Sequence, residues 1–140
     1  MTLDLQNAKE LLSDGGYTCV ICRRDEVYVD TQRGVKPLLD LLDHGVRLSG
    51  FSAADKVIGR ATAFLYVLLG VSNVYTPVIS TAAKDVLERY GVGVYFDLEV
   101  DFIENRSKTG QCPMEDAVRG ITRPDEALRA IRRKYEALNK

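Results

Sequence analysis

Two short groups of residues in this sequence carry side chains that could bind or transform a ligand. The first group is Asp55, Lys56 and Arg60, in a stretch that is otherwise apolar. If a helix begins after Ser52, Lys56 and Arg60 lie one turn apart on the same face. Two cations on a core helix repel each other unless they meet an anion, so the spacing favours a phosphate or carboxylate site with Asp55 as its acid or base. The alternative is a surface turn with solvated charges.

The second group is Cys112-Pro113-Met114-Glu115. Proline is typical of the first position of a helix, which leaves Cys112 near the N-cap. A thiol in that place can have a lowered pKa, so Cys112 is a candidate nucleophile. Glu115 could be the acid or base, or could orient a substrate. The alternative is a half-buried packing cysteine with a glutamate that favours the helix dipole.

Three further residues are candidates for ligand binding. Asn105 and Arg106 fall in a polar, irregular stretch, where binding residues concentrate, and an arginine can hold an acid or phosphate through two hydrogen bonds. A solvated loop is the alternative for this pair. Ser80 stands at a predicted helix start, where capping is the simpler role and contact with a ligand the second.

Cysteine and histidine usage argues against a metal centre or a disulfide framework. The sequence has three cysteines and one histidine. Cys19 and Cys22 lie on a predicted strand and therefore point to opposite faces, which favours buried core thiols over a redox or metal pair. We expect no metal site and no cofactor.

Composition limits the class of protein. The chain has 140 residues, 46% hydrophobic and 28% charged, with a formal net charge of −1, which is typical of one globular domain over residues 1–140. The basic residues of the last helix are interspersed with acidic ones, so we expect no nucleic-acid binding. We also expect a cytoplasmic protein without membrane contact, because no signal-like start is present and the apolar stretch 61–71 is too short to span a bilayer.

Hydrophobic periodicity predicts alternating helices and strands. The predicted helices cover 3–12, 34–44, 54–69, 82–90, 113–120 and 124–137, and the predicted strands cover 17–23, 26–31, 73–79 and 92–96. The first two strands form a hairpin, and the segment 97–110 is irregular. A hairpin followed by right-handed crossovers predicts a three-layer α/β/α sandwich with a mixed sheet.

This layout resembles the cytidine-deaminase fold, and several motifs resemble the DUF1893 family of uncharacterised prokaryotic proteins. The motifs are Gly50-Phe51-Ser52-Ala53-Ala54-Asp55-Lys56-Val57-Ile58-Gly59-Arg60-Ala61, Arg33-Gly34-Val35-Lys36-Pro37-Leu38, Asn105-Arg106 and Cys112-Pro113-Met114-Glu115. Deaminases hold zinc with His or Cys at two helix starts, where this chain has Asp55-Lys56 and Ser80-Thr81. Ordinary zinc-dependent deamination is therefore not expected, whether or not the protein is an enzyme.

The resemblance implies a nucleoside- or nucleotide-like ligand at converging helix starts, surrounded by Asp55, Lys56, Arg60, Ser80, Asn105, Arg106, Cys112 and Glu115. The alternative is a non-catalytic binding or oligomerisation module. For that module, the predicted helix 54–69 offers an apolar face to a second copy through Ala63, Phe64, Tyr66 and Val67.

Overall fold

The structure is a computed structural model that describes residues 1–32, 34–103 and 112–139. Its centre is a mixed sheet of six strands within those residues, namely β1 (Cys19–Arg23), β2 (Glu26–Asp30), β3 (Ser52–Asp55), β4 (Val57–Ile58), β5 (Asn73–Ser80) and β6 (Gly93–Val100). β2 and β3 flank β1 in antiparallel pairs, whereas β3, β4 and β6 run parallel to β5. The predicted hairpin, mixed sheet and parallel crossovers are therefore confirmed.

β3 and β4 lie along the same side of β5. Ser52 pairs with Asn73 and Val57 pairs with Val78, so the register continues unchanged past the interruption at Lys56. β6 pairs with β5 along its whole length and forms one edge of the sheet, while β2 forms the other. Asp55 is thus the last residue of β3, and the short strand β4 begins two residues later.

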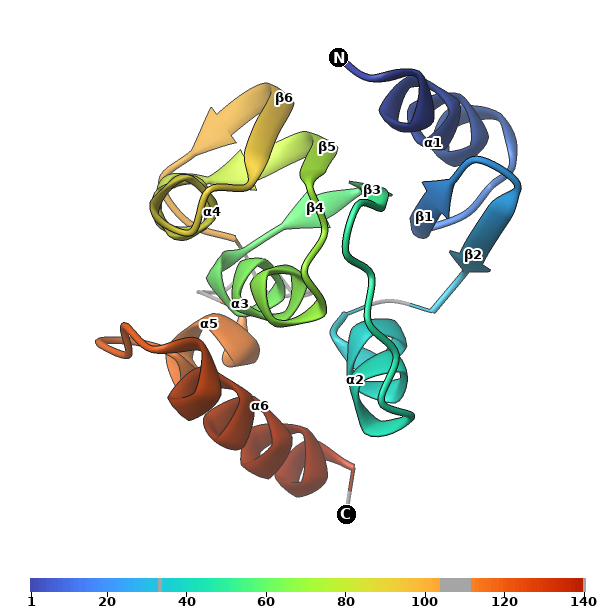
Figure 1. The fold of residues 1–140 in the computed structure, drawn as a ribbon. Coiled ribbons are helices and arrows are strands. Elements are labelled where there is room, and N and C mark those ends of the chain that lie inside the picture. The colour runs from blue at the N-terminus through green and yellow to red at the C-terminus, as the bar shows by residue number, and fades with distance from the viewer. Residues whose placement is uncertain (33, 104–111, 140) are drawn as a thin grey trace.

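Helices cover both faces of the sheet (Figure 1). α1 (Leu3–Asp14) is the one helix of the described residues on its face of the sheet, where Leu5, Ala8 and Leu12 pack on alternate residues of β1, and also on Ala54 and Tyr75. α2 (Lys36–Asp43), α3 (Arg60–Leu69) and α4 (Thr81–Arg89) lie on the other side and enclose the larger core. α5 (Pro113–Ala117) and α6 (Pro124–Leu138) form a further cover outside α3, with Ala127 and Ile131 buried.

The predicted helix 54–69 is wrong in its first third. Ser52 does not cap a helix but pairs with Cys22 and Asn73 in the middle of the sheet, and α3 begins only at Arg60. A strand that is buried on both faces shows no polar alternation, and the small residues Ala53 and Ala54 suit this crowded position despite their helix propensity.

β6 is longer than predicted and extends to Val100, so the segment 97–100 is not irregular. Asp97 and Leu98 are exposed there, and Glu99 forms an ion pair with Lys84, as suits an edge strand that borders water. No helix among the described residues is long and apolar enough to cross a lipid bilayer.

The hairpin turn stores backbone strain that one substitution can remove. Arg24 has φ of 54° in the two-residue loop between Arg23 and Glu26, and glycine is the residue preferred at this first loop position. We predict that Arg24→Gly raises the free energy of unfolding by about 0.5–1 kcal/mol, measured by urea denaturation. The backbone bond from the N–H of residue 24 to Asp4 Oδ1 remains available.

Asp25→Gly is the matched control, because Asp25 is outside the set of described residues with positive φ and should lose stability on substitution. A loss of stability in Arg24→Gly as large as in the control would contradict the assignment of strain to Arg24.

Candidate functional site

The N-terminus of α3 is closed by a carboxylate from the C-terminal part of the chain. Glu115 Oε1 accepts a hydrogen bond from the backbone N–H of Arg60 at 2.6 Å, and Oε2 accepts one from Ala61 at 2.9 Å. The first N–H groups of a helix have no partner within the helix and attract negative charge. Glu115, which is only 5% exposed, supplies both acceptors.

Gly59 makes this contact sterically feasible. It is the N-cap residue of α3 and has no side chain to satisfy the helix itself. A Cβ at this position would lie 2.6 Å from Oε1 and 2.7 Å from Cδ of Glu115. The glycine is therefore needed for space, since its φ of −95° is open to any residue.

Arg60 is engaged within the protein as well. Its guanidinium donates to the carbonyl oxygen of Ile121 and lies 5.5 Å from the ring centroid of Phe64. Lys56, by contrast, is exposed between β3 and β4, ahead of the helix. The prediction that Lys56 and Arg60 share one helical face is therefore wrong, because α3 begins at Arg60, six residues after the predicted start at residue 54.

Asp55 belongs to a hydrogen-bonded chain that crosses the core. Tyr66 Oη donates to Asp55 Oδ2 at 2.6 Å, and Cys19 Sγ lies 3.3 Å from the same hydroxyl. Cys19 also pairs with Asp55 across β1 and β3, so the three residues tie two strands to α3. Cys19 and Tyr66 are almost completely buried, whereas Asp55 is partly exposed.

Of the three hydrogen-bonded side chains, Asp55 is the one that titrates near neutral pH. Loss of solvation raises the pKa of Asp55 to about 7, although hydrogen bonds from Tyr66 and from the backbone of Val57 and Lys56 lower it. Burial also raises the pKa of Tyr66 and of Cys19 far above their usual values. The phenol and the thiol therefore stay protonated at neutral pH, and Asp55 alone of the three can exchange a proton there.

The remaining predicted residues have modest structural roles or fall outside the description. Ser80 is 1% exposed, and its Oγ accepts from Ala83 N–H at 3.1 Å, so it caps α4. Cys112 is half-buried at the start of the five-residue helix α5, and its N–H donates to Ile103 O at 2.8 Å. Asn105 and Arg106 lie outside the described residues.

The sheet brings two helix starts together, although the first lies at Gly59 and not at Asp55, where it was predicted. Ile58 pairs with Ile79, so Gly59 and Ser80 follow side by side where β4 and β5 end. Glu115 joins them from α5, while Asp55 lies at the end of β3. Sequence reasoning missed Gly59 and the Cys19–Tyr66 pair, because a glycine and two polar atoms in apolar runs give no sign of their partners.

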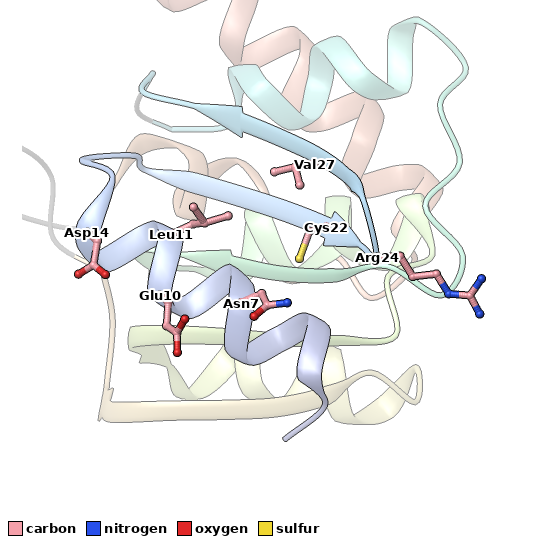
Figure 2. Close-up of a pocket in the computed structure, with 7 residues that line it drawn as sticks. All are labelled: Asn7, Glu10, Leu11, Asp14, Cys22, Arg24 and Val27. Atoms are coloured by element: carbon pink, nitrogen blue, oxygen red, sulfur yellow. The ribbon is translucent and has the colours of Figure 1, made fainter.

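A shallow hollow of about 370 Å³ lies elsewhere, between α1 and the β1–β2 hairpin (Figure 2). It is lined by Asn7, Glu10, Leu11, Asp14, Cys22, Arg24 and Val27, none of which was predicted as a site residue. In Figure 2 the Arg24 side chain points outward, away from α1. Across the described ranges, no group of three or more His, Cys, Asp or Glu side chains is placed to hold a metal ion.

Comparison with known proteins gives a family and a fold. A family model described as a domain of unknown function (DUF1893) matches residues 7–135. The chain is similar to the crystal structure of a DUF1893 family protein from Thermotoga maritima, with a TM-score of 0.88 and 21% identity over 96% of this chain and 92% of that one. At this identity the likeness shows the fold alone. No curated protein matches the sequence.

The contact between Gly59 and Glu115 predicts a specific stability loss. Gly59→Ala should lower the free energy of unfolding by about 1–3 kcal/mol, because the new methyl group displaces the carboxylate from the α3 N-terminus. Urea denaturation of the single variants and of Gly59→Ala/Glu115→Ala tests the cause. The double variant should lose clearly less than the sum of the single losses. Additive losses would mean that the methyl group acts through another contact.

The raised pKa of Asp55 predicts how stability depends on pH. Because the pKa in the folded state, about 7, lies above the ordinary aspartate value of 3.8, the folded protein binds this proton more tightly than the unfolded chain. The contribution of Asp55 to stability therefore falls as pH rises from about 4 to about 7. Asp55→Asn removes the titration and keeps an oxygen that can accept from Tyr66.

We expect the difference in Tm, variant minus wild type, to increase from pH 5 to pH 8 in thermal denaturation. Asp97→Asn is the control, since Asp97 accepts from Tyr75 at 2.5 Å in a second tyrosine–aspartate pair that involves β6. A constant difference across this range for Asp55→Asn would show that the carboxyl group titrates normally.

Proposed function

The chain belongs to the DUF1893 family of domains of unknown function, and we propose that it binds a nucleoside-like small molecule where β3, β4 and β5 end. The order of a hairpin followed by β3, α3, β5, α4 and β6 supports a cytidine-deaminase-like architecture. In open α/β sheets, ligands bind beyond the carboxyl ends of the parallel strands. The paired starts of α3 and α4 lie at that end, and Asp55 lies at the end of β3, four residues before Gly59.

The observation that carries the proposal is the state of Asp55. A partly buried carboxyl group with a pKa of about 7 accepts hydrogen bonds when ionised and donates one when protonated. Both modes suit the edge of a nucleobase, which presents amino and carbonyl groups side by side. Tyr66 holds the carboxyl in place through the 2.6 Å bond to Oδ2.

The residues at the two helix starts do not fit a zinc ion. Gly59-Arg60 and Ser80-Thr81 offer no thiolate or imidazole, and Glu115 already occupies the first of these starts. Asp55 is the proposed acid or base, and Lys56 lies beside it in the sequence. Cys112, at the start of α5, remains the proposed nucleophile.

A second candidate function is a binding module in a cytoplasmic protein that kept the fold without chemistry. The observation that favours it is the internal engagement of Glu115 and Arg60, which leaves neither free for a substrate. One route to such a module is wrong, however. Ala63, Phe64 and Tyr66 are completely buried in the core, so this face of α3 cannot bind a second copy.

Thermal denaturation against a panel of nucleobases and nucleosides tests the proposed site. A ligand at about a hundred times its Kd adds about 2.7 kcal/mol of stability, which raises Tm by roughly 5–10 °C in a domain of this size. We expect a shift for at least one nucleoside in wild type and in Asp97→Asn, and its loss in Asp55→Asn.

Two results would count against the site. A shift that persists in Asp55→Asn would place the ligand elsewhere, for example in the hollow beside α1. No shift across the panel would favour the binding module.

A further inference from the structure

We infer that Glu115 determines ligand specificity, because its carboxylate fills the α3 N-terminus and thereby selects uncharged ligands against phosphorylated ones at the proposed site. This inference rests on the proposed function and narrows it to nucleosides or bases rather than nucleotides. Its own test does not require that a nucleoside bind.

The argument starts from the two hydrogen bonds at 2.6 and 2.9 Å that Glu115 accepts from Arg60 and Ala61. These N–H groups and the positive end of the helix are what a phosphate group usually uses at a helix start. Here a carboxylate of the chain itself takes that position. Gly59 leaves the room for it, since a Cβ would overlap the carboxyl group.

The place that Glu115 occupies is next to the proposed ligand. Gly59 and Ser80 follow paired residues of β4 and β5, and Lys56 and β4 separate Asp55 from Gly59 along the chain. An extended residue advances by about 3.3 Å, so the start of α3 is roughly 13 Å from Asp55. A ligand anchored at Asp55 that carries an anionic group toward α3 would meet a buried carboxylate.

Neither Arg60 nor Lys56, the two cations beside β4 among the described residues, offsets that repulsion. The Arg60 guanidinium is directed to the Ile121 carbonyl and the Phe64 ring, and so it does not face Glu115 as a partner for a second anion. Lys56 is exposed, and water and salt screen its charge. A buried anion beside a phosphate should lower affinity by at least about tenfold.

The test compares wild type with Glu115→Ala and Glu115→Gln in sodium sulfate and in sodium chloride at equal ionic strength. Glu115→Ala opens the two N–H groups, whereas glutamine still fills the space. We expect sulfate to raise the Tm of Glu115→Ala by about 5 °C more than that of wild type. The effect on Glu115→Gln should lie between the two, because glutamine removes the charge but still fills the space. Glu115→Ser is the second open variant if alanine prevents folding.

Binding of a nucleoside and of its 5′-monophosphate to the same proteins completes the test. Wild type should prefer the nucleoside by at least about tenfold, and the preference should narrow in the open variant. Equal sulfate responses in all three proteins, or a wild-type preference for the monophosphate, would overturn the role of Glu115. Absence of nucleoside binding with a sulfate response confined to the open variants would instead overturn the proposed function alone.

Discussion

The contact of the Glu115 carboxylate with the first turn of α3 is the constraint on which the described site depends. It caps α3, whose N-cap residue Gly59 has no side chain. It also ties α5 to the end of the sheet at which β4 and β5 stop. The Arg60 bond to Ile121 works in the same direction, because it ties the start of α3 to the segment before α6. Two residues that sequence patterns present as catalytic or ligand-binding thus hold the C-terminal helices in place.

The Asp55 cluster plays a different part in the same region. Its carboxyl group loses solvation at the end of β3 and keeps only one tyrosine and nearby backbone groups as partners. A protein that needed only structure at this point would be more stable with a neutral side chain, since an ionised carboxyl is costly to bury. Retention of a titratable group at the end of β3, one short strand before the paired helix starts, is therefore the feature on which the proposed function rests.

The sequence predicted much of the architecture because hairpins and amphipathic helices have local signals. Gly15, Gly45 and Gly70 follow helices that end where expected, and Pro113 and Pro124 begin two others. The start of α3 had no such signal. Ser52 and Asp55 imitate a cap and its partner, whereas the true cap comes from Glu115, 55 residues after Arg60 in the chain. Contacts over that distance decide the site and are invisible to patterns of neighbouring residues.

The most direct test of the account is a ¹³C NMR titration of the Asp55 carboxyl group in aspartate-labelled protein, with Asp55→Asn to assign the signal. The account predicts a midpoint near pH 7 in the free protein, which moves when a nucleoside binds. A midpoint near pH 4 would show a solvated, ordinary carboxylate, and it would contradict the claim that this end of the sheet holds a buried group poised to exchange a proton.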